Sequence, residues 1–265
     1  KVRGFLGKKQ VLVASLLAFI IGPLVGAFWT FEKKDLYRII KRAKWEVIGA
    51  TMRLGFTVEH ILVVGRKETP RKELLKAVRL SEGAPIINFD IQAARDRVED
   101  LPWIRNAQIE RILPHTILLK VQEREPLALW QFQGQFSLID HDGTVILRDD
   151  LGRFSELIVV VGDGAHLKAS KLIETLRHEP ELLALVEAAV WVGGRRWNVR
   201  LKGNIDVRLP EENAKIAWQR LAEYERAYDI LERGVQILDL RLPGRLIVRQ
   251  TPQPKPLRKI GGRQT

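Results

Sequence analysis

The side chains that could perform acid–base or metal chemistry are scattered along this chain. It has five histidines, namely His60, His115, His141, His166 and His178. No two of them are four residues apart and no HExxH motif occurs, so the spacing that places two zinc ligands on one helix face is missing. The chain also has no cysteine, which excludes a thiolate nucleophile, a disulfide framework and a Cys-ligated zinc site.

Short motifs that resemble binding loops lack the residues they would need. Asp140-His141-Asp142-Gly143 begins like a calcium loop, but Leu151 stands where an EF-hand requires its final glutamate, so we interpret the motif as a turn. Gly162-Asp163-Gly164 lacks the third glycine of a dinucleotide fingerprint. Glu123 and Glu125 share one face of a predicted strand, a pattern typical of a solvated strand edge. We therefore expect no catalytic residue, no metal and no cofactor.

The net charge of +12 lies in a C-terminal tail and on the two flanks of an apolar stretch. Residues 1–10, 32–55 and 251–265 each contribute +4, which leaves the rest of the chain neutral. A protein that binds nucleic acid through its folded surface should be basic in the fold. The distribution favours a membrane surface and argues against nucleic acid.

Residues 11–31, VLVASLLAFIIGPLVGAFWTF, contain no charged residue. As a helix they would be about 31 Å long, enough to cross the hydrocarbon core of a bilayer. We predict a transmembrane helix; a buried soluble helix and a cleaved signal peptide are the alternatives. Basic residues flank both ends, so the positive-inside rule does not decide the orientation. Because the chain begins at Lys1, we expect a further segment upstream.

Residues 32–55 combine basic residues with apolar residues at near-helical spacing. This pattern predicts a juxtamembrane amphipathic helix, which lies on the lipid surface or serves as a plain linker.

Residues 56–125 change hydrophobic period in the order βααββ. Thr69 followed by Pro70 predicts the start of one helix, and Asp90 can cap a second helix that stops before Pro102. Two alternating strands follow, so we expect a small mixed sheet with two helices on one face.

Residues 126–250 predict a second domain of short strands with glycine-rich turns, which indicates an antiparallel sheet with helices. Its longest helical pattern is residues 211–233, where one stripe consists of Ala214, Ala217, Leu221, Tyr224, Tyr228 and Leu231. That stripe fits core packing better than a binding groove. Pro243-Gly244 then predicts the turn of a final hairpin, and the basic, proline-rich residues 251–265 predict a disordered tail.

Four segments in order resemble the FtsQ/DivIB family of bacterial cell-division proteins. They are VEHILVVGRKETPRKELLKAV, LPWIRNAQIERILPHTILLKVQEREPLALW, GGRRWNVRLKGNIDVRLPEE and ILDLRLPGRLIVR, within a similarity that runs from about residue 11 to 250. The resemblance implies an α+β protein of the bacterial inner membrane, with residues 1–10 ending a cytoplasmic tail. It further implies a periplasmic POTRA domain over 56–125 and a β domain over 126–250.

The resemblance also implies a function and partners. Members of this family are non-catalytic scaffolds that join FtsB and FtsL and link early and late division proteins at the septum. By motif, FtsB would add to the last strand, with Leu246, Ile247 and Val248 in the pairing strand and Arg241 and Leu242 beside it. Arg195 or Arg196 would form a salt bridge to an acidic partner residue. That last strand is an edge in this reading, and a closed or internal strand in the alternative.

Two other classes of function stay open at this point. A POTRA-bearing transport or outer-membrane assembly component would usually continue into a large β-barrel, for which the chain has no sequence. A membrane-anchored hydrolase with a dispersed site would lose turnover on single substitutions of histidines or carboxylates.

Overall fold

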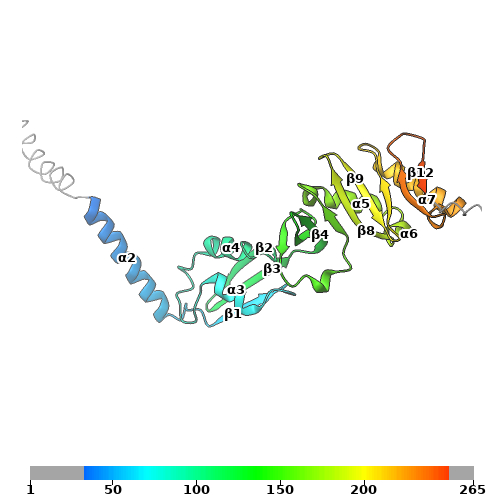
Figure 1. Cartoon of the computed structure of the whole chain (residues 1–265). Helices are drawn as coiled ribbons and strands as arrows, with labels where there is room; N and C mark the ends of the chain where they lie inside the picture. The colour runs from blue at the N-terminus through cyan, green and yellow to red at the C-terminus, as the bar shows by residue number, and fades with distance from the viewer. Residues whose placement is uncertain (1–32, 251–265) are drawn as a thin grey trace, which may run out of the picture. The chain divides into compact units, whose positions relative to one another are not determined.

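The computed structural model of the chain describes residues 33–250 (Figure 1). The predicted tail end 1–10, transmembrane helix 11–31 and C-terminal tail 251–265 lie outside these residues. Within 33–250, no helix combines the length and the apolar character that a membrane crossing requires. The described residues divide into two compact units, one with residues 33–64, 71–97 and 108–120, the other with residues 65–70, 98–107 and 121–250.

A long helix opens the described chain. α2 covers Lys33–Arg53, as the spacing of apolar residues in 32–55 predicts. From residue 40 onward nearly all of its side chains are exposed, and Ile48 is the one that is buried.

The first sheet has the predicted βααββ order. The elements are β1 (His60–Val64), α3 (Arg71–Val78), α4 (Ile91–Glu99), β2 (Ile104–Ile112) and β3 (Thr116–Glu123). The strand order is β1-β3-β2, with β1 parallel to β3. Asp90 caps α4 as predicted, since its Oδ1 accepts a hydrogen bond from the backbone N–H of Ala93 at 3.0 Å. α3 begins at Arg71, after Pro70, one residue later than the sequence pattern predicts.

The second sheet is mixed, so the prediction of an antiparallel sheet is wrong. Its strands are β4 (Pro126–Phe132), β5 (Gln135–Asp140), β6 (Val145–Leu147), β7 (Val159–Val161), β8 (Val186–Val192), β9 (Arg196–Leu201), β10 (Ile205–Arg208), β11 (Val235–Asp239) and β12 (Ile247–Gln250). They lie in the order β12-β11-β10-β9-β8-β7-β4-β5-β6. The pairs β4/β7, β7/β8 and β10/β11 are parallel. The last two of these pairs are joined through helices, and such crossovers connect parallel strands where short turns cannot.

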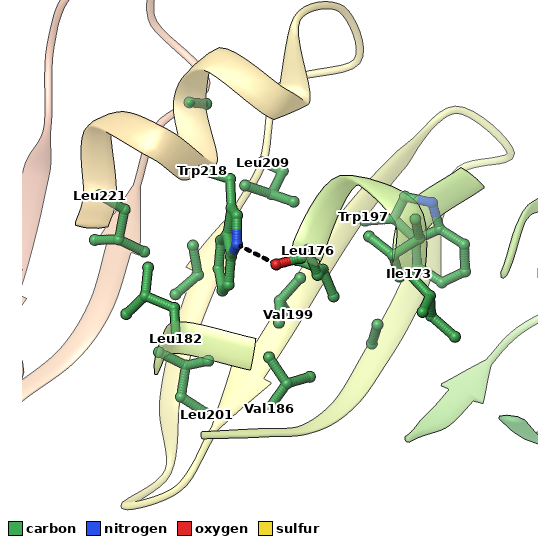
Figure 2. Close-up of a cluster of buried hydrophobic side chains, with 14 of the residues drawn as sticks. Ile173, Leu176, Leu182, Val186, Trp197, Val199, Leu201, Leu209, Trp218 and Leu221 are labelled. Carbon is green, nitrogen blue, oxygen red and sulfur yellow. Dashed lines mark hydrogen bonds between the residues drawn. The ribbon is translucent and has the colours of Figure 1, made fainter. Parts of the chain in front are cut away.

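Helices of the second unit cover one face of this sheet. α5 (Ala169–Leu176), α6 (Pro180–Leu183) and α7 (Ala214–Tyr228) pack on β8 to β11 (Figure 2), and the short turns η1 (Gly152–Phe154), η2 (Ala165–Lys168) and η3 (Ile230–Glu232) complete the unit. The indole of Trp218 is fully buried and donates a hydrogen bond to the backbone oxygen of Leu176 at 3.2 Å. The predicted stripe of α7 needs one correction, because Trp218 belongs to the core while Tyr228 is 56% exposed.

Candidate functional site

The last strand, β12, lies at one end of the nine-stranded sheet. It pairs with β11 in an antiparallel hairpin, and Gly244 adopts a φ of +72° in the connecting turn, as the Pro243-Gly244 pair predicts. All four residues of β12 are exposed, with Ile247 52% and Val248 42% exposed. Among residues 33–250 no strand pairs with the outer edge of β12.

Strand register places the two exposed apolar residues of β12 on opposite faces of the sheet. Val248 is paired with Leu238, which is fully buried in the core under the helices. Ile247 is paired with Asp239, whose neighbour on β10 is Arg208. Since paired residues share a face, Ile247 lies beside a polar row on the face that the helices leave uncovered.

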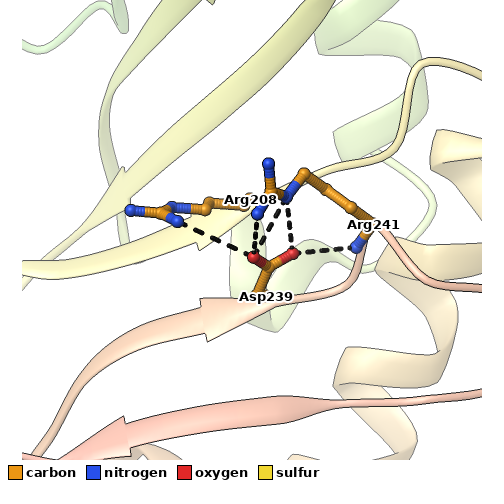
Figure 3. A network of polar contacts seen from close by, with 3 residues as sticks. All are labelled: Arg208, Asp239 and Arg241. Atoms are coloured by element: carbon orange, nitrogen blue, oxygen red, sulfur yellow. Dashed lines mark hydrogen bonds and ion pairs between the residues drawn. The ribbon is translucent and has the colours of Figure 1, made fainter.

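That polar row contains a compact ion-pair network (Figure 3). Arg241 donates from Nη2 to Asp239 Oδ2 at 2.6 Å and from Nε to Oδ1 at 2.9 Å, and its backbone N–H donates to Oδ1 at 3.1 Å. Arg208 Nη1 lies 3.7 Å from the same carboxylate. The Arg241 side chain, followed by its backbone N–H, holds the pKa of Asp239 below its ordinary value, and Asp239 in turn raises the pKa of Arg241.

This network predicts how stability depends on pH. Because the folded-state pKa of Asp239 is lowered, its stabilising contribution is present above pH 3.8 and is lost as pH falls through the folded-state value. Asp239→Asn should therefore cost about 2 kcal/mol of unfolding free energy at neutral pH, with the cost shrinking in acid. Urea unfolding of both proteins across pH, followed by circular dichroism, measures this difference.

A more exposed ion pair supplies the control. Arg200 and Asp206, 2.7 Å apart, lie on the neighbouring strands β9 and β10, and the side chain of Asp206 is 36% exposed against 12% for Asp239. Asp206→Asn should cost less than about 1 kcal/mol at neutral pH. The prediction is contradicted if both substitutions lower the unfolding free energy equally. It is also contradicted if the loss caused by Asp239→Asn does not change with pH.

The structure brings five of the six predicted partner-binding residues together at this end of the sheet. Ile247 and Val248 form β12, while Leu246 precedes the strand and packs on the core. Leu242 is 49% exposed in the connecting loop. Arg241 also lines a cleft of about 200 Å³ whose other walls include Ile216, Leu240 and Pro243.

The sixth residue, Arg196, lies elsewhere on the sheet. It opens β9, which is separated from β12 by three strand spacings of about 4.8 Å, or about 14 Å. Arg196 shares a strand face with Asn198, which is paired with Arg208 of the polar row. The Arg196 Nε and the Asn198 Oδ1 are buried and have no hydrogen-bond partner. Arg195 is exposed and only loosely paired, 3.9 Å from Glu211.

Sequence reasoning missed Asp239 and Arg208 as parts of this site. Residues 239 and 241 are two apart, so on a continuous strand their side chains lie on the same face. This spacing could have predicted the contact between Asp239 and Arg241. Arg208 is distant in sequence and joins only through the parallel pairing of β10 with β11.

The motifs that could have carried chemistry have structural roles. Asp140 Oδ1 accepts hydrogen bonds from the backbone N–H groups of Asp142 and Thr144 at 2.9 and 2.8 Å, which confirms the predicted turn. Burial alone would raise the pKa of Glu123, but hydrogen bonds from the backbone of Glu68 and Thr69 lower it overall. Within residues 33–250 no three histidine or carboxylate side chains converge as a metal site would require.

Comparison with known proteins identifies relatives along most of the chain. The family described as "POTRA domain, FtsQ-type" matches residues 56–124, and the one described as "Cell division protein FtsQ/DivIB, C-terminal" matches residues 128–241. The second match ends before β12. The cell division protein FtsQ of Rickettsia felis is 30% identical over 239 residues, covering 90% of this chain and 85% of the relative. FtsQ of Zymomonas mobilis is 31% identical, covering 95% and 78%, and FtsQ of Caulobacter vibrioides is 35% identical, covering 74% and 65%.

Proposed function

Because the chain belongs to the FtsQ/DivIB family of bacterial cell-division proteins, we propose that it is a non-catalytic scaffold that binds FtsB and FtsL through the free edge of β12. In this role it links early and late division proteins at the septum.

The exposed edge of β12 is the observation that carries this proposal. An edge strand presents unpaired backbone N–H and C=O groups, which an incoming strand satisfies by continuing the sheet. β12 is four residues long and exposed throughout, with an apolar side chain on each face. Backbone pairing would supply affinity, while contacts to Ile247 and Val248 would supply register and specificity.

The surroundings of β12 support a partner that is both apolar and acidic. The cleft between the start of α7 and the loop that follows β11, beside Arg241 and Leu240, can receive a small apolar side chain. In the free protein the guanidinium of Arg241 is already paired with Asp239. An acidic partner residue would therefore compete with Asp239 for Arg241, or join the ion-pair network through Arg208. Arg196, on the same face but three strands away from β12, would then meet a segment that precedes or follows the added strand.

The same proposal includes a membrane anchor. The charge-free residues 11–31 would cross the inner membrane once, with residues 1–10 in the cytoplasm. Residues 32–55 would follow the anchor, leaving a POTRA domain over 56–125 and a β domain over 126–250 in the periplasm.

A single charge on β12 tests the partner site. Ile247→Glu in the full chain should abolish co-purification with FtsB and FtsL from detergent-solubilised membranes, because strand addition would bury a second carboxylate directly opposite Asp239. Circular dichroism should show a folded protein, since Ile247 is 52% exposed.

The matched control is Ile112→Glu, which changes a 46% exposed isoleucine of β2 in the first sheet. This variant should retain both partners. Full retention by Ile247→Glu, or equal loss by both folded variants, would remove β12 as the binding site.

A further inference from the structure

A stripe of exposed apolar side chains follows one side of α2. It consists of Ile40, Ala43, Val47, Ala50 and Leu54, the last of which directly follows the helix. Successive members are three or four residues apart, so they line a single face. Ile40, Val47 and Leu54 are 59%, 62% and 73% exposed. Ala43 and Val47 also border a cavity of about 250 Å³ that they share with Ile87 and Asn88, but it leaves Val47 largely exposed.

The rest of the helix surface is mainly basic, with Trp45 and Met52 as the exposed apolar residues opposite the stripe. Lys33–Arg53 contains seven lysines and arginines against two acidic residues. Lys41, Arg42 and Lys44 are exposed on the sides away from the apolar stripe. An apolar stripe bordered by cations is complementary to a surface with an apolar interior and anionic groups at its boundary.

We infer that the apolar stripe of α2 binds the surface of a bilayer that contains anionic phospholipids. Ile40, Val47 and Leu54 would enter the acyl boundary, and the basic side chains would reach the headgroups. The uncharged residues 11–31 directly precede α2, which keeps the helix close to lipid under the proposed anchoring. A second copy of α2 is a poorer occupant, because two helices with this basic excess repel each other.

The absence of cysteine allows a direct test in the full chain. Val47→Cys lies on the apolar stripe, while Trp45→Cys lies on the opposite side of α2 and changes no charge; both positions are exposed, at 62% and 63%. Each variant is labelled with an environment-sensitive fluorophore and reconstituted in phosphatidylcholine vesicles with or without phosphatidylglycerol. Iodide in the water and brominated lipid in the bilayer serve as the two quenchers.

In vesicles with phosphatidylglycerol, the label at residue 47 should be blue-shifted and quenched by brominated lipid, and the label at residue 45 should be quenched by iodide. At ~1 M salt, where the screening length is ~3 Å, the difference should largely vanish. Changing Lys41 or Arg42 to glutamine in the Val47→Cys background should lower the equilibrium constant for binding of α2 to the lipid surface about fivefold per charge removed.

Three results would overturn the inference. The first is that iodide quenches both labels in vesicles that contain phosphatidylglycerol. The second is that the label at residue 47 is equally protected from iodide quenching in vesicles without phosphatidylglycerol. The third is shielding that disappears when the protein is diluted in lipid, which would assign the stripe to a second copy of α2. Anchoring of residues 11–31 is read separately, from resistance of the vesicle-bound protein to carbonate extraction.

Discussion

Replacing Trp218 by alanine is expected to lower the unfolding free energy of the second unit by about 3 to 5 kcal/mol. The indole is fully buried between α7 and α5, against residues that include Leu176 and Leu221 (Figure 2). Alanine leaves a large cavity and removes the hydrogen bond to the backbone oxygen of Leu176. Urea unfolding followed by circular dichroism measures the loss.

Two further substitutions separate the causes. Trp218→Phe removes the indole N–H but keeps most of the volume, and Leu176 O still accepts a hydrogen bond from the backbone N–H of Glu179 at 3.1 Å. That variant should cost about 1 to 2 kcal/mol. Trp45→Ala on α2 changes a 63% exposed tryptophan and should stay within about 0.5 kcal/mol. A small loss for Trp218→Ala would contradict the packing described for α7.

The cost at Trp218 bears on the proposed partner site. α7 is the crossover that connects β10 to β11, and β11 is the strand on which β12 pairs. A loosened α7 would therefore weaken the sheet that presents the edge. We expect Trp218→Ala to reduce partner retention through stability, whereas Ile247→Glu acts on a folded protein.

Gly65→Ala is expected to cost about 3 to 5 kcal/mol, the sum of backbone strain and a steric clash. Gly65 has a φ of +87°, and a Cβ built there would lie 2.0 Å from the backbone oxygen of Val121. A backbone carbonyl cannot move aside without displacing β3. Chemical denaturation of the full chain is the measurement, with circular dichroism as the readout.

Gly134 provides the matched control for strain alone. It has a φ of +80° in the two-residue turn between β4 and β5, and a Cβ there would meet nothing within 4 Å. Gly134→Ala should cost about 1 to 2 kcal/mol, the penalty of the left-handed backbone. If both substitutions cost the same, the close approach of Gly65 to Val121 is not a constraint on the fold.

Local features of this chain were predictable because they depend on neighbours within a few residues. The βααββ order, the cap at Asp90, the turn at Asp140 and the hairpin around Pro243-Gly244 all follow from side-chain period and turn chemistry. The same reasoning located the last strand and its apolar residues Ile247 and Val248.

Tertiary structure decided the features that depend on which strands become neighbours. Periodicity is the same for parallel and antiparallel strands, so it did not reveal that β7 lies between β4 and β8 or that β10 pairs with β11. It also placed Tyr228, and not Trp218, on the core stripe of α7, because helical spacing alone does not say how wide the buried face is.

The candidate site shows the same division. Sequence pattern predicted the type and position of the terminal strand, and the family resemblance added Arg241 beside it. Only the parallel pairing of β10 with β11 brought Arg208 to Asp239, and only the packing of α7 on one face left Ile247 on the other. Contacts between residues far apart in sequence depend on the closure of the whole sheet, which no local spacing records.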